Sequence, residues 1–282
     1  MGLVMHPRRA VSWPCVAMFA CAAGLAGGAL VASMAPGLIP LAKAALAAEE
    51  SVPSLTRKAE GLSNMVLGER SVDYFQAQPE GETGWPGIVL LHDGWGMRDE
   101  VKAIARRLAE EGFVVVVPDL NGGRIAKTAD KAREISILMD KAAAVSIASA
   151  VGEHMKQQSY TGDHRVGIVG IDSGGYLALR ASMETSAFSA VVTIYGKPIE
   201  DADELRRIGA PLLGVFAGAD KLIPVADVER FSAALQAGNR TAEIRIYENA
   251  AHGFMDEGSE SHDKSAASDA WSLIASFLRA HL

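Results

Sequence analysis

The segment that most constrains this chain runs from Arg165 to Arg180 and reads RVGIVGIDSGGYLALR. An apolar run at residues 166–171 ends at a turn of small residues, and a helical pattern follows at once. This order predicts a buried strand, a tight turn and a helix whose first backbone N–H groups face the turn. Glycines on both sides of the turn let the chain bend sharply and let the helix pack close to the sheet. The side chain that such a turn presents to a bound molecule is here Asp172.

The rest of the chain alternates apolar runs with helical patterns. Residues 64–77 predict a starting hairpin. Further buried strands are predicted at residues 88–91, 113–117, 190–195, 211–217 and 242–247, and helices at 100–111, 131–158, 225–237 and 264–280. Strands and helices that alternate at short spacing predict an α/β fold with a mostly parallel sheet flanked by helices. An apolar content of 49% over 282 residues is enough for one large core, so we expect one domain over residues 52–282.

The first 48 residues differ from the rest in composition. An arginine pair at residues 8–9 precedes residues 10–47, where a single lysine is the only charge, and Ala-Leu-Ala at 45–47 offers a cleavage site. This order predicts a signal peptide and an exported, periplasmic protein, and the arginine pair points to the twin-arginine route. The alternatives are an uncleaved membrane anchor through residues 11–36, which is long enough to span a bilayer, and a cytoplasmic chain.

Charge and cysteine content exclude several function classes. The formal net charge is −7, which argues against a nucleic-acid partner. Both cysteines, Cys15 and Cys21, lie in the first segment, so the remaining chain has no disulfide and no cysteine-based metal site. We find no glycine-rich phosphate loop, metal-ligand spacing or dinucleotide fingerprint. We therefore expect no metal and no cofactor, and a small-molecule substrate as the partner.

Parallel α/β sheets carry their functional groups on the loops beyond the carboxyl ends of the strands. Those loops hold the following candidates: Asp93, Gly94, Arg124, Asp172, Ser173, Asp220 and His252. Their chain order of nucleophile, acid and histidine matches hydrolytic triads. We predict that Asp172 is the nucleophile, that Asp220 orients His252, and that His252 is the general base. The other candidates are predicted to bind substrate or an oxyanion, the latter through the Gly94 N–H.

Each candidate also has a structural interpretation. Asp172 is a preferred helix N-cap residue, a role worth about 1 kcal/mol, and Ser173 is an alternative nucleophile. His252 would otherwise be a hydrogen-bonded structural histidine, Asp220 a turn residue and Arg124 a solvated loop arginine. The Asp93 side chain would only shape its loop. Three more loop residues are interpreted as structural: His92, Asp119 and Tyr195.

Several segments together resemble the dienelactone hydrolase family of α/β-hydrolases. In chain order they are His92-Asp-Gly-Trp-Gly96, Gly112-Phe-Val-Val-Val-Val-Pro-Asp-Leu120, the segment around Asp172, Tyr195-Gly196, Gly218-Ala-Asp220 with Ile223-Pro224, and Ala251-His-Gly-Phe254. They cover residues 88–282. The resemblance implies an α/β-hydrolase fold and a hydrolase acting on a small organic ester, lactone or related substrate.

The chain departs from that family at the positions that carry its chemistry. The family usually has Cys where this chain has Asp172, and Glu where it has Asp93, and that Glu helps to activate the thiol. Members that bind a carboxylated lactone use two arginines. At one of these positions the chain has Gly123, with Arg124 offset by one, and at the other it has Asp256. Dienelactone itself is therefore not the expected substrate.

A carboxylate nucleophile points to a different bond. Asp has a reference pKa of about 3.9 and is ionised without a base. Its attack on an ester carbonyl would give an anhydride, whereas attack on a saturated carbon bearing halide or epoxide oxygen gives an ordinary ester. The Asp172 turn thus also resembles those of haloalkane and haloacid dehalogenases and epoxide hydrolases. Those enzymes carry a cap domain, for which residues 196–210 are too few. A catalytically silent member that binds a ligand is the third alternative.

Overall fold

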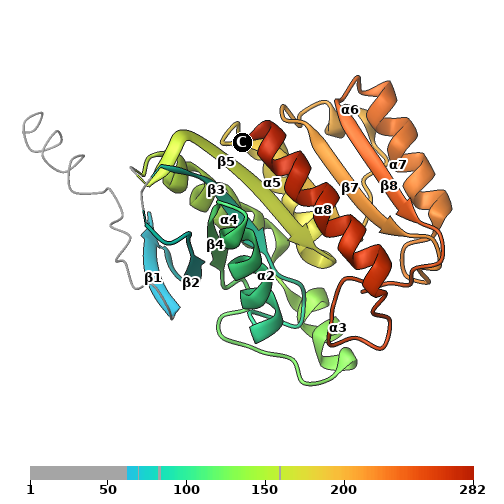
Figure 1. The fold of residues 1–282 in the computed structure, drawn as a ribbon, viewed down its shortest axis with the longest axis horizontal. Helices are drawn as coiled ribbons and strands as arrows, with labels where there is room; N and C mark the ends of the chain where they lie inside the picture. The colour runs from blue at the N-terminus through green and yellow to red at the C-terminus, as the bar shows by residue number, and fades with distance from the viewer. Residues whose placement is uncertain (1–61, 69, 82–83, 159) are drawn as a thin grey trace, which may run out of the picture. The chain divides into compact units, whose positions relative to one another are not determined.

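The computed structural model describes residues 62–68, 70–81, 84–158 and 160–282 (Figure 1). The chain divides at residue 50, and residues 51–282 form one compact unit. The predicted signal peptide or anchor at residues 1–48, including the apolar stretch 11–36, lies outside the described residues and stays a prediction. Everything below concerns the unit of residues 51–282.

One eight-stranded sheet forms the centre of this unit. Its strands are β1 (Leu62–Leu67), β2 (Arg70–Ala77), β3 (Trp85–Leu91), β4 (Val114–Pro118), β5 (Thr161–Ile171), β6 (Phe188–Ile194), β7 (Leu212–Ala217) and β8 (Ala242–Tyr247). The order across the sheet is β1-β2-β4-β3-β5-β6-β7-β8. Strands β1, β2 and β4 pair antiparallel, and all pairs from β4 to β8 are parallel. The predicted hairpin and mostly parallel sheet are confirmed.

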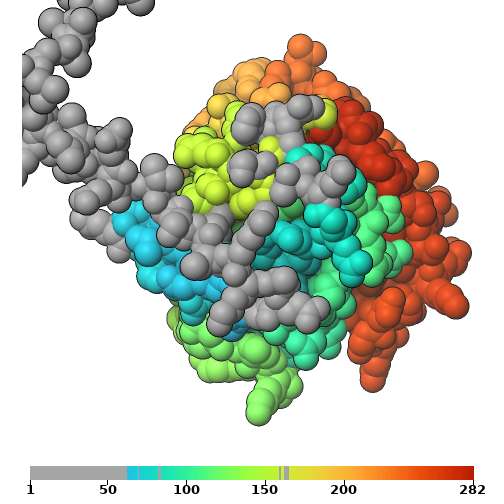
Figure 2. All heavy atoms as spheres, turned by 60° about the vertical axis from the view of Figure 1, so that its left-hand side comes forward, coloured from blue at the N-terminus to red at the C-terminus, as the bar shows by residue number. Residues whose placement is uncertain are grey.

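Helices cover both faces of the sheet (Figure 1). They are α2 (Asp99–Glu110), α3 (Ala129–Leu138), α4 (Lys141–Lys156), α5 (Ser173–Glu184), α6 (Ala202–Leu205), α7 (Val225–Ala237) and α8 (Lys264–His281). Apolar side chains of α4, α5 and α7 pack in one core cluster, and those of α2 and α8 pack in a second. Figure 2 shows the hairpin and α8 on opposite sides of the visible surface, in blue and red. The α/β-hydrolase fold predicted from the sequence therefore holds.

The prediction of one long helix over residues 131–158 is wrong. The structure has two helices, α3 and α4, with an 84° bend between them. Met139 is extended at the break, and the Asp140 carboxylate accepts a hydrogen bond from the Ala143 N–H at 3.0 Å, which starts α4. Among the described residues no single helix is long and apolar enough to cross a membrane, and α3 and α4 meet that criterion only as a bent pair.

The segment between β6 and β7 decides whether a cap domain is present. It is fully described, from Tyr195 to Pro211, and its only helix is the four-residue α6. No cap domain is inserted at this point. The carboxyl ends of the central strands are instead approached by α3 and by the loops that follow β3 and β8.

Candidate active site

The turn between β5 and α5 holds Asp172 in a strained conformation. Its φ is +50° and its ψ is −117°, a region that non-glycine residues occupy at a cost of about 1–3 kcal/mol. The next turn of chain fits only because Gly174 lacks a side chain: a Cβ there would lie 2.3 Å from the Leu91 carbonyl oxygen. The Asp172 side chain makes no capping hydrogen bond to α5. The helix-cap interpretation of Asp172 therefore has no support in the structure.

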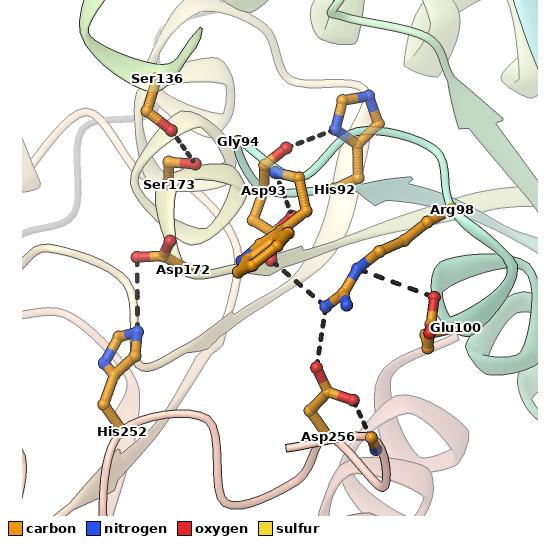
Figure 3. Close-up of polar contacts among 12 residues, drawn as sticks. His92, Asp93, Gly94, Arg98, Glu100, Ser136, Asp172, Ser173, His252 and Asp256 are labelled. Atoms are coloured by element: carbon orange, nitrogen blue, oxygen red, sulfur yellow. Dashed lines mark hydrogen bonds and ion pairs between the residues drawn. The ribbon is translucent and has the colours of Figure 1, made fainter. Parts of the chain in front are cut away.

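His252 lies between two carboxylates, on the loop that follows β8. Its Nδ1 is 2.7 Å from Oδ2 of Asp220, and its Nε2 is 3.7 Å from Oδ1 of Asp172 (Figure 3 shows the second contact). Asp220 follows β7, and its Oδ1 accepts the backbone N–H groups of Leu222 and Ile223 at 2.7 and 3.0 Å. The fold thus brings together the three residues predicted to form the triad.

The charges of this trio reinforce one another. Burial alone would raise the pKa of Asp220, but the His252 hydrogen bond and the backbone N–H groups hold it below its usual value. Burial would lower the pKa of His252, and the hydrogen bond to Asp220 with the charge of Asp172 raises it instead. An ionised Asp220 accepts the Nδ1–H, so Nε2 is the ring nitrogen that faces Asp172 and can exchange a proton there. This arrangement can take a proton from water and stabilise the resulting imidazolium.

Asp172 opens only toward the cavity. Its side chain is 40% exposed there, yet the surrounding protein atoms and the buried position of the turn raise its pKa, against the opposing charge of His252 and the Ser173 N–H. A carboxylate that is partly removed from water is a better nucleophile than one in bulk water, and the charge of His252 favours its ionised form. The geometry therefore suits a reacting carboxylate.

A cavity of about 820 Å³ opens in front of this trio. Its walls come from the β3–α2 loop, α2, α3, the β5–α5 turn, the end of β6 and residues 252–259. Five predicted site residues line it: Asp93, Gly94, Asp172, Ser173 and His252. Asp220 lies behind the His252 ring. Arg124 is exposed and donates its Nε–H to the Asn121 carbonyl at 2.8 Å, and it is not among the lining residues described.

Gly94 and Ser173 lie where α3 meets the β5–α5 turn. A Cβ on Gly94 would be 2.1 Å from Oγ of Ser136 and 2.3 Å from the Ala132 carbonyl oxygen, so only glycine fits under α3. The Ser173 hydroxyl is 3.5 Å from the Ser136 hydroxyl, and these described residues include no hydrogen bond between Ser173 and His252. The Ser173 N–H belongs to the first turn of α5, where helix N–H groups face an anion.

His92 is held as a structural group. It is fully buried, and its Nε2 accepts the Leu120 N–H at 3.0 Å, so Nδ1 carries the proton and donates to the Asp93 carbonyl at 2.7 Å. Burial lowers the pKa of His92 and keeps it neutral. Tyr195, also interpreted as structural, is part of the site. Its ring centre lies 5.0 Å from that of His252, and the residue lines the cavity.

Arg98 was not predicted, although it lies on the same loop as Asp93. Its Nη2 donates to Oδ2 of Asp256 at 2.8 Å and is 4.0 Å from Oδ2 of Asp93, as Figure 3 shows. The guanidinium also lies 5.1 Å from the centre of the Trp95 ring. The resemblance placed an arginine at the position of Asp256, and the fold supplies a cation there from another loop. The sequence signal that could have identified Arg98 is its position at the end of the loop between β3 and α2, directly before the helix.

The Arg98–Asp256 pair is expected to stabilise the fold because it ties two loops that are 158 residues apart. Both side chains are about one-fifth exposed, so Arg98→Ala should lower the free energy of unfolding by about 1–2 kcal/mol. Chemical denaturation of both proteins measures the change. Arg230→Ala removes the two surface ion pairs of a half-exposed arginine, with Glu200 and Asp227, and should change little. Equal effects of the two substitutions would contradict a structural role for the Arg98 pair.

The described residues contain no group of three or more His, Cys, Asp or Glu side chains arranged to hold a metal ion. Comparison with known proteins gives the site its context. Residues 72–282 match the sequence model described as "Dienelactone hydrolase family". The chain belongs to the dienelactone hydrolase family. The match covers all the residues of the site described above, and the family is one of hydrolases.

The relatives of this dienelactone hydrolase family member are distant. "Protein usf" of Aquifex pyrophilus is 28% identical over 209 residues, which cover 71% of this chain and 90% of that protein. A "Putative carboxymethylenebutenolidase" of Methylorubrum extorquens is 24% identical over 260 residues, covering 82% and 87%. The crystal structure titled "Putative Dienelactone Hydrolase" from Klebsiella pneumoniae has a TM-score of 0.71 and 22% identity, covering 78% and 97%. The structural likeness supports the fold.

Proposed function

We propose that this protein hydrolyses a small organic ester, lactone or related substrate in the cavity, with Asp172, His252 and Asp220 as the reacting groups. The observation that carries the proposal is the His252 ring, which lies between two carboxylates at the cavity wall, one of them on a strained turn. The names of curated relatives, which point to a lactone hydrolase, support the substrate class.

The reaction begins with attack by Asp172, which needs no base. Because attack on a carbonyl would form an anhydride, the favoured target is a saturated carbon that carries the leaving group: the alkyl carbon of a lactone or ester, a carbon–halogen bond or an epoxide. The bond to the leaving group breaks, its electron pair leaves with that group, and an ester of Asp172 forms. No cap domain narrows this choice of substrate.

Water then releases the product. His252 takes a proton from a water molecule through Nε2, and the hydroxide adds to the carbonyl carbon of the Asp172 ester. Asp220 stabilises the imidazolium through Nδ1. The N–H groups of Ser173 and Gly94 are the donors available to the oxyanion. Collapse of the intermediate expels the product alcohol, which takes the proton from His252, and Asp172 is restored with one oxygen from water.

The oxygen of Asp172 therefore reports the mechanism. We would screen esters, lactones, halo-acids and epoxides, and then run a single turnover with excess enzyme in oxygen-18 water. Tryptic peptide 166–180 contains Asp172 as its only acidic residue. Its mass should rise by the difference between one oxygen-18 and one oxygen-16 atom. Peptide 222–230, which carries two acids outside the trio, is the internal control and should stay unlabelled.

The alternatives give different results. Turnover without label at Asp172 would mean that His252 directs water straight to the substrate, which overturns the nucleophile. Turnover that survives Asp172→Ala would place the reaction elsewhere. No turnover with any substrate, together with ligand-dependent stabilisation of the fold, would favour the catalytically silent member.

A further inference from the structure

The carboxyl group of Asp93 faces the cavity but is not used by the steps above. Its Oδ1 accepts the Trp95 N–H at 2.9 Å, and its Oδ2 lies 4.0 Å from Nη2 of Arg98. In Figure 3 it lies between Asp172 and Arg98. Only 7% of the residue is exposed, and the cavity is bounded by it. A group held by one backbone N–H, with its second oxygen toward a substrate cavity, is placed to exchange a proton there.

The neighbours of Asp93 determine its protonation. Burial raises the pKa of Asp93 to about 7, and the charges of Asp172 and Asp256 add to that rise. Arg98 opposes it, but its closest partner is Asp256 at 2.8 Å, so only part of its charge acts on Asp93. Tyr195 and His252 face the same space from the end of β6 and the loop after β8. A large fraction of Asp93 is therefore protonated at neutral pH, and its proton is available.

Asp93 is not needed to activate the proposed nucleophile, Asp172. In the family resemblance the acid at this position helps to activate a thiol. Here the turn carries a carboxyl group, which needs no general base to become a nucleophile. An acid on the wall opposite a nucleophile can instead supply the proton that an expelled oxygen needs.

We propose that Asp93 is the general acid that protonates the leaving oxygen while Asp172 attacks, and that it thereby sets which leaving groups the site can expel. The inference rests on the proposed function. As the Asp172 oxygen bonds to carbon, the carbon–oxygen bond of the substrate breaks and its electron pair takes the proton from Asp93. Asp93 is left as a carboxylate beside Arg98. After hydrolysis of the ester, the proton of the restored Asp172 carboxyl returns to Asp93 through solvent, and the cycle balances.

Tyr195 is the rival donor on the same wall. Its ring contacts His252, and its hydroxyl has no hydrogen bond among the described residues. Burial and the charges of Asp93 and Asp256 raise the pKa of Tyr195 above its usual value, so it releases a proton far less readily than Asp93. The geometry therefore points to Asp93 rather than to Tyr195.

The test compares two leaving groups on the same carbon chain with the full-length protein. The bromide of a primary alkyl bromide leaves as an ion and needs no proton, whereas the oxygen of the matching terminal epoxide leaves as an alkoxide and needs one. Asp93→Asn keeps the acceptor for the Trp95 N–H and removes the acid. We expect kcat/KM to fall about 100-fold for the epoxide and by less than about threefold for the bromide.

The pH profile gives a second readout. Epoxide turnover by the wild type should rise as His252 loses its proton and fall again as Asp93 loses its own near pH 7, giving a bell. Bromide turnover should keep only the rising limb. Asp93→Asn should remove the falling limb, and Asp93→Glu should restore part of the epoxide activity and the bell shape.

The possible outcomes distinguish a failure of the general acid from a failure of the proposed function. Equal losses for both leaving groups in Asp93→Asn, with wild-type turnover and labelled Asp172 intact, would overturn the general acid and leave the proposed function standing. A leaving-group effect in Tyr195→Phe but not in Asp93→Asn would move the role to Tyr195. A wild type that does not turn over the epoxide would overturn the general acid, whereas the proposed function is decided separately by the screen of esters, lactones, halo-acids and epoxides. Thermal unfolding of each variant shows whether a loss comes from the fold instead.

Discussion

Replacing His252 with alanine is expected to stop the reaction halfway and leave the substrate attached to Asp172. The first step of the proposed reaction, attack by the Asp172 carboxylate, does not use His252, so bond breaking should still occur once per site. Hydrolysis of the ester needs a base, and its rate should fall by about 10⁴-fold, the loss typical of a disabled triad. The measurement is a burst of one leaving group per protein molecule, together with the mass of the alkyl group on peptide 166–180.

Two control variants test the interpretation of this result. Asp172→Ala should give neither burst nor adduct, because no carboxylate remains to be alkylated. His281→Ala removes another histidine, whose ring contacts that of Phe277 at the end of α8 in a tilted arrangement, and should hydrolyse substrate like the wild type. Steady turnover by His252→Ala, without an accumulating adduct, would exclude His252 as the base for the second step.

Replacing Gly174 with alanine is expected to destabilise the fold strongly, even though alanine favours helices. Helix propensity would contribute up to about 1 kcal/mol in favour of the change. The new Cβ, however, would lie 2.3 Å from the Leu91 carbonyl oxygen and 2.6 Å from that of His92, and backbone atoms cannot rotate away. Strand β3 and helix α5 would have to separate, at a cost of about 3 kcal/mol or more. Denaturant unfolding, followed by circular dichroism, measures the difference.

Gly209→Ala is the matched control. A Cβ at Gly209 meets nothing within 4 Å, and its backbone is not in the left-handed region, so the midpoint of unfolding should stay close to that of the wild type. If both alanine variants unfold at the wild-type midpoint, the close approach of β3 and α5 does not stabilise this protein. Loss of activity in Gly174→Ala without loss of stability would mean that the turn adjusts locally.

Much of the fold follows from short-range signals in the sequence. Continuous apolar runs predicted the central strands because strands buried on both faces leave few polar positions. The break between α3 and α4 was missed because both halves have helical periodicity. The single signal of the break is the N-cap residue Asp140, which has helix-compatible residues on both sides. The direction of α3 depends on its packing against Trp95 and the β5–α5 turn, which no local pattern contains.

The site was predictable where position along the chain fixes position in space. Asp172, Asp220 and His252 each follow a strand, and parallel strands end at one edge, so loop position and family resemblance brought them together. Arg98 and Asp256 could not be paired in this way, because their contact joins two loops from opposite ends of the domain. Arg124 illustrates the reverse: it sits next to a family position in sequence, yet its side chain turns back to the Asn121 carbonyl.

The carboxylate at the β5–α5 turn also differs from a thiol in the reagents that can inactivate it. A thiol at that position would be open to oxidation by peroxide and to disulfide exchange, each of which blocks the thiolate. Asp172 contains no sulfur, and no cysteine occurs anywhere from residue 22 to the end of the chain. Oxidants that would inactivate a thiol at this turn therefore leave the carboxylate of Asp172 unchanged.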